Sequence, residues 1–166
     1  MSLTMEERNI TPSEAYPGDK TTTKAAEPEL LRVEITGERY TSKEFKDQEW
    51  THMWRRVWMI AGMADDCAEP GDFFTCDLGH EPLLFVRGKD GVNGFYNICQ
   101  HRGAKLVLQE KGMMDSFSCI YHGWKYGLEG ELIEAQDRDD FERDPCEHVR
   151  LADFRTEIFA GFVWYC

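Results

Sequence analysis

The amino-acid sequence predicts a mainly β protein, an antiparallel sandwich or small barrel with a helix near its amino terminus. From residue 57 onward, short runs rich in Val, Ile, Phe and Tyr alternate with turn residues such as Gly, Asp and Pro. Strands this short and this closely spaced are typical of antiparallel sandwiches and small barrels. A pattern of helical period precedes the first run. The length of 166 residues allows one domain with a core, together with tails.

The amino-terminal part predicts an arm followed by a helix. It is rich in Thr, Glu, Pro, Lys and Ala and has almost no large apolar side chains, so burial cannot offset its ordering entropy. We expect a disordered or loosely ordered arm over residues 1–40 and one folded domain over 41–166. Thr41 and Glu44 fit a capping box with Thr41 as the N-cap, and apolar residues at helical spacing follow. This pattern predicts a helix from about 42 to 56.

The rest of the chain predicts strands joined by tight turns. Turn signals stand at 89–91, where the sequence is Lys-Asp-Gly, and at 129–130, where it is Glu-Gly. The charged segment 137–148 interrupts the strand pattern and predicts a solvated loop. The expected strands are 57–63, 73–77, 82–86, 94–98, 116–120, 125–128, 131–134, 154–159 and 162–165.

Composition excludes several classes of partner. The formal net charge of −12 argues against nucleic acid and against an anionic membrane surface. The longest apolar run, 158–166, is nine residues, whereas a helix needs about 20 to cross a bilayer. The amino terminus lacks the basic and apolar regions of a secretory signal, so we expect a cytoplasmic protein. Cytosolic thiols stay reduced, and the six cysteines therefore raise the question of metal binding.

Two short segments each offer one cysteine and one histidine. Cys99 and His101 are separated by one residue, and Cys119 and His122 by two. A zinc finger groups two cysteines on one arm and two histidines on the other, because all four ligands converge on a single tetrahedral ion. Here each arm mixes the two ligand types, which points away from that arrangement.

The mixed arms fit a binuclear centre with two chemically distinct irons. If two loops face each other across a [2Fe–2S] rhomb, one cysteine from each ligates the inner iron and one histidine from each ligates the outer iron. Gly103 and Gly123, which follow the two histidines, would let the backbone turn tightly and present amides to the sulfurs. The sequence therefore predicts a [2Fe–2S] cluster with Cys99, His101, Cys119 and His122 as ligands.

These residues resemble a known family, the Rieske proteins. CQHRGAKL and CIYHGWKYGLEGEL look like the family's two cluster loops, here at about 99–104 and 119–124. MWRRVW, followed by EPGDFFTCDLGHEPLLFVRGKDG, resembles the entry to the large (alpha) subunit of the Rieske non-haem iron aromatic-ring-hydroxylating oxygenases. The resemblance spans about 41–166. It implies a Rieske-type fold with a two-loop cluster-binding subdomain and a function in one-electron transfer.

The resemblance also implies surroundings and partners for the cluster. Trp124 stands where the family has an aromatic residue that shields the cluster, and Arg102 beside His101 is a candidate for docking a redox partner. The implied electron donor is a ferredoxin or a flavin/iron–sulfur reductase, and the implied acceptor is a mononuclear-iron catalytic domain, reached within a homotrimer. Ala104 and Tyr121 replace the extra cysteines of the respiratory Rieske proteins. We therefore expect a potential in the lower part of the range of about −150 to +300 mV.

One departure from the oxygenases is an absence. Their O2-activating iron needs two closely spaced histidines and a carboxylate, and no two further histidines in this sequence are that close. We therefore expect no catalytic residue here and a catalytic domain outside this chain. By itself, this chain should only transfer electrons. A stand-alone Rieske ferredoxin and a structural zinc domain remain as alternatives. No ligand role is assigned to the other cysteines and histidines, Cys67, Cys76, Cys146, Cys166, His52, His80 and His148.

Overall fold

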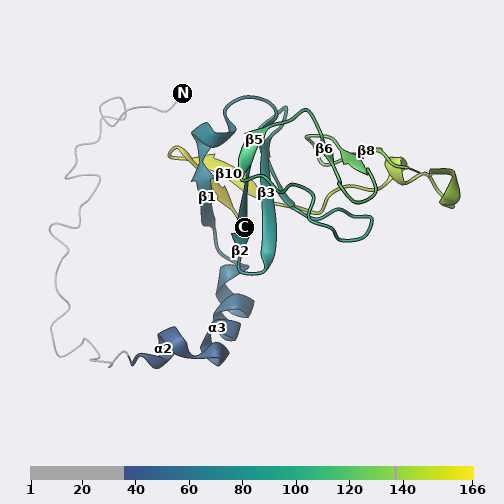
Figure 1. Ribbon diagram of the computed structural model, residues 1–166. Helices are drawn as coiled ribbons and strands as arrows, with labels where there is room; N and C mark the ends of the chain where they lie inside the picture. Colours follow the sequence, from purple (N-terminus) through teal and green to yellow (C-terminus); the bar gives the residue numbers. More distant parts are fainter. Residues whose placement is uncertain (1–35, 137) are drawn as a thin grey trace, which may run out of the picture. The chain divides into compact units, whose positions relative to one another are not determined.

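A computed structural model of the chain describes residues 36–136 and 138–166 (Figure 1). The chain consists of two compact units, and the boundary between them lies between Lys46 and Asp47. Most of the predicted arm, residues 1–35, lies outside the described residues. No helix of the described part is long and apolar enough to cross a membrane.

The helix predicted from about 42 to 56 is present as an α-helix followed by a turn of π type, and its N-cap differs from the predicted one. Helix α3 (Lys43–Glu49) continues into a turn of π type (Trp50–Trp54), and the short helix α2 (Glu38–Thr41) precedes it. The prediction that Thr41 is the N-cap is wrong. Thr41 ends α2 and its hydroxyl donates to the Gly37 carbonyl, whereas the Ser42 hydroxyl accepts from the backbone N–H of Phe45 at 3.2 Å. Ser42 thus satisfies a free N–H of the first turn of α3.

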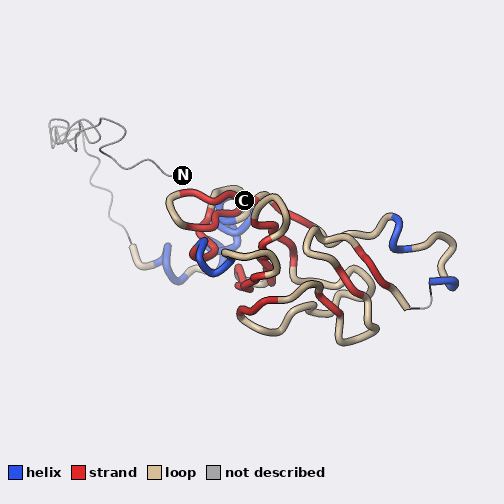
Figure 2. The backbone as a smooth tube through the Cα atoms, turned by 90° about the horizontal axis from the view of Figure 1, so that it is seen from above, coloured by secondary structure: helices blue, strands red, loops and turns tan. Residues whose placement is uncertain are grey.

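The strands form three antiparallel sheets, as the mainly β prediction requires (Figures 1 and 2). Their orders are β1-β11-β10, β5-β2-β3-β4-β9 and β6-β7-β8. The strands are β1 (Met59–Met63), β2 (Asp72–Leu78), β3 (Glu81–Arg87), β4 (Val92–Tyr96), β5 (Lys111–Met113), β6 (Phe117–Ser118), β7 (Lys125–Tyr126), β8 (Leu132–Glu134), β9 (Asp153–Phe154), β10 (Thr156–Phe159) and β11 (Phe162–Tyr165).

Two local predictions needed correction, and two turns were confirmed. The expected strand 154–159 divides at Arg155, because β9 pairs with β4 whereas β10 pairs with β11 in a different sheet. Strand β5 was not predicted, since its three residues are exposed and owe their extended form to pairing with β2. The turn at 89–91 joins β3 to β4, and the turn at 129–130 joins β7 to β8.

The charged segment after β8 is mainly exposed, as expected of a solvated loop. It contains two short 3₁₀ turns, Arg138–Asp140 and Pro145–Glu147, drawn in blue in Figure 2. A third 3₁₀ turn, Ala64–Cys67, connects β1 to β2. Residue 137 lies outside the described residues.

The five-stranded sheet has a core on each face. Along β3 the side chains of residues 83–86 are all buried, with Leu84 and Val86 in one core and Leu83 and Phe85 in the other. This alternation follows from the two-residue period of a strand. A run of consecutive apolar residues is therefore the signature of a strand buried on both faces.

The two cores contain different parts of the molecule. One core joins the five-stranded sheet to the sheet β6-β7-β8 and includes the buried cysteines Cys99 and Cys119 together with Trp124 and Tyr126. The other core joins it to the sheet β1-β11-β10 through Val163 and Tyr165. The first core is the one that positions the predicted cluster loops.

Candidate cluster-binding site

The two predicted cluster loops have the same backbone hydrogen bonds. In the first loop (99–104), the N–H of Cys99 donates to the carbonyl of Ala104 at 2.8 Å, and the N–H of Gly103 donates to the carbonyl of Cys99 at 2.9 Å. In the second loop (119–124), Cys119 N–H donates to the Trp124 carbonyl at 2.8 Å, and Gly123 N–H donates to the Cys119 carbonyl at 2.9 Å. Each loop is thus closed on its own cysteine.

Both glycines occupy the conformation that such closure requires. Gly103 has a φ of 73° and Gly123 a φ of 69°. This left-handed region penalises any residue with a Cβ, and glycine avoids the penalty. A side chain at Gly123 would in addition come within 2.9 Å of the Gln136 amide. The tight turns expected from the sequence are therefore present in both loops.

The four predicted ligands lie at two depths. Cys99 and Cys119 are buried in the core, whereas His101 and His122 are half-buried, with ring centroids 4.7 Å apart. Desolvation raises the pKa of the Cys99 thiol, and the neighbouring Cys119 adds to this effect. The arrangement places a pair of sulfurs inside and a pair of imidazoles outside.

His101 has an atom that lacks a partner. Its Nδ1 is buried without a hydrogen bond, which is costly for a polar atom unless another group completes it. Desolvation, assisted by the nearby charges of His122 and Arg102, lowers the pKa of His101. A neutral imidazole with an available ring nitrogen is the form that binds a metal. The donor set of two thiols and two imidazoles therefore fits a [2Fe–2S] cluster.

Tyr126 also belongs to the candidate site, because its hydroxyl lies next to the predicted ligand Cys99. Its hydroxyl accepts the backbone N–H of Gln100 at 3.0 Å and lies 3.4 Å from the sulfur of Cys99. Because the Gln100 N–H occupies a lone pair, the hydroxyl hydrogen can point to the sulfur. Burial is the largest of the causes that raise the pKa of Tyr126, so it remains a donor. The available signal was its inward position in β7, since a buried tyrosine hydroxyl needs a partner.

Aromatic and charged side chains surround the histidines. The Trp124 indole is 4% exposed and stacks on the His101 ring, with centroids 4.6 Å apart and an angle of 11° between planes. The Tyr121 ring lies 3.8 Å from that of His122. The guanidinium of Arg102 stands over Tyr121 at 5.7 Å from the ring centroid. Trp124 thus covers one histidine, and Arg102 with Tyr121 lies beside the other.

Asn97 fixes the position of the first loop, and sequence reasoning missed it. Its side chain is fully buried, donates to the carbonyl of Val107 at 2.7 Å and accepts the Val107 N–H at 2.8 Å. These bonds join the segments that enter and leave the loop containing Cys99. The signal in the sequence was a polar residue inside an apolar strand, two positions before the cysteine.

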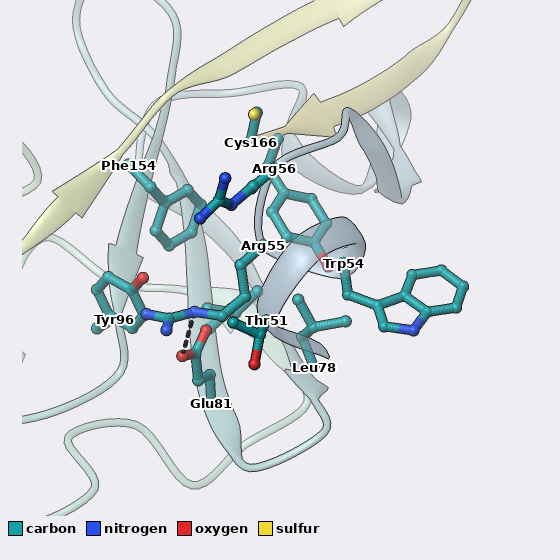
Figure 3. Close-up of a pocket in the computed structure, with 11 residues that line it drawn as sticks. Thr51, Trp54, Arg55, Arg56, Leu78, Glu81, Tyr96, Phe154 and Cys166 are labelled. Carbon is teal, nitrogen blue, oxygen red and sulfur yellow. Dashed lines mark ion pairs between the residues drawn. The ribbon is translucent and has the colours of Figure 1, made fainter. Parts of the chain in front are cut away.

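No single-ion site is apparent among the described residues, where no three Cys, His, Asp or Glu side chains are grouped to hold one metal. A cavity of about 380 Å³ lies away from the cluster loops and contains none of the predicted ligands (Figure 3). It is lined in part by Tyr96, Phe154 and an ion pair between Arg55 and Glu81 at 3.2 Å.

A small antiparallel β domain that presents one cysteine and one histidine on each of two matched loops is typical of a class, the binuclear iron–sulfur proteins with mixed ligands. Comparison with known proteins gives the family. The sequence model of the Rieske [2Fe–2S] domain family matches residues 57–151, and the chain belongs to this family. A Rieske-type [2Fe–2S] cluster is accordingly its cofactor.

Several of the relatives are alpha or oxygenase subunits of oxygenases. The chain is 36% identical over 97 residues to the glycine betaine monooxygenase oxygenase subunit of Pseudomonas aeruginosa, covering 58% of this chain and 23% of the relative. It is 36% identical over 131 residues to the benzene 1,2-dioxygenase alpha subunit of Pseudomonas putida, covering 74% and 29%. The structure of the quaternary ammonium Rieske monooxygenase CntA superposes with a TM-score of 0.73 at 30% identity, covering 79% and 37%. The aligned part of the chain thus covers between 23% and 37% of these proteins.

Proposed function

We propose that this chain transfers single electrons through a [2Fe–2S] cluster held by Cys99, His101, Cys119 and His122. One observation carries the proposal: two loops with the same hydrogen bonds bring two buried cysteines and two half-buried histidines together in pairs. Two pairs suit two irons, each of which takes two protein ligands. A single zinc ion would need the four side chains to converge on one point.

The cluster, when bound, supplies a centre that gains and loses one electron. The chain's own residues set the environment of that centre. The Tyr126 hydroxyl donates toward the sulfur of Cys99, and His101 donates its backbone N–H to the same sulfur. Donors to a thiolate stabilise negative charge on it, so these two groups favour the reduced state. Trp124, stacked on His101, excludes water from that side of the histidine pair.

The exposed ends of the two loops are the proposed entry point for the electron. Ile120 is 76% exposed and Tyr121 58% exposed, and Arg102 lies over the Tyr121 ring. An apolar surface with a single cation next to the histidines suits brief docking of an acidic redox partner. The proposed donor is a ferredoxin or a flavin/iron–sulfur reductase.

We place the chain, with its proposed domain over 41–166, in the alpha subunit of a Rieske oxygenase. The proposed acceptor is a mononuclear-iron catalytic domain, reached across a subunit boundary in a homotrimer. The relatives named for benzene and biphenyl dioxygenases support aromatic ring hydroxylation as the activity of that subunit. The proposed location is the cytoplasm. Those named for glycine betaine, carnitine and choline favour a second candidate, the oxidation of quaternary ammonium compounds.

The ligand assignment is tested by metal analysis and spectroscopy of the purified chain. We expect a red-brown protein with two irons and two acid-labile sulfides, and a Rieske-type EPR signal after reduction. Cys119→Ser should abolish the signal, because an inner ligand is lost, whereas the control Cys76→Ser should retain it. A colourless protein with one zinc, or a full signal in Cys119→Ser, would contradict the proposal.

The role in an oxygenase is tested by adding electrons. With a suitable reductase and reduced nicotinamide nucleotide, the chain should take up one electron per cluster and form no hydroxylated product. If the reading frame continues beyond Cys166, the longer protein should form product with the same cluster spectrum. Product formation by residues 1–166 alone would refute the assignment of the chain as an electron carrier.

A further inference from the structure

A line of ring contacts runs from a proposed cluster ligand to the surface. The face of Trp124 stacks on the ring of His101, and the ring of Phe141 meets Trp124 edge-on, with centroids 5.9 Å apart and an angle of 62°. Trp124 is 4% exposed, whereas Phe141 is 40% exposed. Phe141 is therefore the outer cover of the indole that shields His101.

Phe141 stands in the charged segment that the sequence analysis assigned only to solvent. Solvation explains the charged side chains of that segment, but it does not explain an exposed phenylalanine. It is surrounded in sequence by Asp139, Asp140, Glu142 and Arg143, which need no packing partner. Its contact with Trp124 gives the apolar ring a role in this loop.

The loop that presents Phe141 is closed at its base. Arg138 forms an ion pair with Asp144, including a bond from its Nε at 3.1 Å. Asp144 also accepts the backbone N–H of Cys146 at 2.9 Å, and the adjacent Pro145 is buried. With both ends tied, the segment from 138 to 144 holds Phe141 at one place against the indole.

We propose that Phe141 is a positioning residue that holds Trp124 flat against His101 and limits the access of water to that side of the cluster. The inference rests on the proposed function, since it takes His101 as a cluster ligand. Phe141 itself touches neither the ligand nor the metal site. It acts through the indole.

The physical consequence is a change in reduction potential. With two thiolates, two sulfides and two ferric ions, the oxidised cluster has no net charge, and reduction adds one negative charge. Water stabilises the charged state more than an apolar side chain does. Loosening of Trp124 should therefore raise the potential.

The test compares Phe141→Ala and Phe141→Leu with a matched control, Phe159→Ala. Phe159 is 70% exposed in β10 and makes no ring contact with the cluster loops. None of the three changes alters the charge of the protein, so a shift in potential would not arise from a gained or lost charge. The measurements are the midpoint potential from an EPR-monitored redox titration and the deuterium modulation of the reduced cluster in D2O, which reports nearby exchangeable solvent.

We expect an upward shift in potential and stronger deuterium modulation in Phe141→Ala, a smaller change of the same sign in Phe141→Leu, and neither in Phe159→Ala. If Phe141→Ala does not retain the cluster, the Leu variant decides. Wild-type potential and modulation in a variant with an intact EPR signal would overturn the inference, as would an equal shift in the control. A wild-type protein without iron and sulfide would instead overturn the proposed function on which the inference rests.

Discussion

Replacing Tyr126 by phenylalanine should lower the reduction potential of the cluster. The change removes one hydroxyl and keeps the ring, which is fully buried. The lost group lies 3.4 Å from the sulfur of Cys99 and 3.0 Å from the backbone nitrogen of Gln100. Since the hydroxyl donates toward a sulfur that becomes more negative on reduction, its removal destabilises the reduced state more than the oxidised one.

The size of the shift follows from the strength of one hydrogen bond. Hydrogen bonds to charged groups contribute about 1 kcal/mol more than those between neutral groups. For a one-electron couple a tenfold change in equilibrium constant is 59 mV and about 1.4 kcal/mol, so about 1 kcal/mol corresponds to a decrease of about 40 mV. The Gln100 N–H also loses its acceptor, which should cost about 1–3 kcal/mol of unfolding free energy.

The assay is a redox titration of Tyr126→Phe beside Tyr165→Phe. Tyr165 is a matched control, because it is also a buried tyrosine, but it belongs to the other core and its hydroxyl lies 4.0 Å from the sulfur of Met59. We expect the control to keep the wild-type potential. An unchanged potential in Tyr126→Phe, with the cluster signal intact, would refute the account of Tyr126 as a donor to the cluster ligand.

Two further predictions concern stability. Asn97→Ala should lower the unfolding free energy by about 2–4 kcal/mol, because it leaves the buried N–H and carbonyl of Val107 without partners. Urea unfolding would measure this loss. A loss below about 1 kcal/mol would contradict the role given to Asn97. Burial raises the pKa of the Cys67 thiol from 9.0 to about 11. The folded-state pKa lies above the unfolded one, so this contribution to stability is complete below about pH 9 and is lost as the pH rises to about 11. Between pH 8 and pH 11 the unfolding free energy of the wild type should fall by about 2–3 kcal/mol more than that of Cys67→Ala. Equal falls in the two proteins, measured by unfolding at both pH values, would disprove this prediction.

The sequence by itself determined the β class and the identity of the candidate ligands. Periodicity shows the strands because a strand alternates its faces every two residues. Strands β2 and β3 lie where the apolar runs predict them, and β4 begins two residues before the expected strand 94–98. The mixed spacing of Cys99, His101, Cys119 and His122 pointed to two metals because ligand type and order are chemical properties of the chain itself. Gly103 and Gly123 follow the same logic, since a turn with a positive φ favours glycine wherever it occurs.

Sequence reasoning was less accurate where two local choices compete. Thr41 and Ser42 are both capping residues, and the choice fell to Ser42 because Thr41 belongs to the preceding turn. The run 154–159 is one apolar pattern, yet its two halves pair with strands of different sheets. Pairing partners far away in the sequence decide such boundaries.

Only the tertiary structure decided what surrounds the cluster site. The Tyr126 hydroxyl reaches Cys99, Asn97 joins the two ends of the first loop, and Phe141 covers Trp124. Each of these contacts joins residues at least ten positions apart in the chain. A residue's type shows what it can bind, and local periodicity shows which way it faces. Which atom it meets depends on how the sheets and loops pack, and that packing is set by the whole chain.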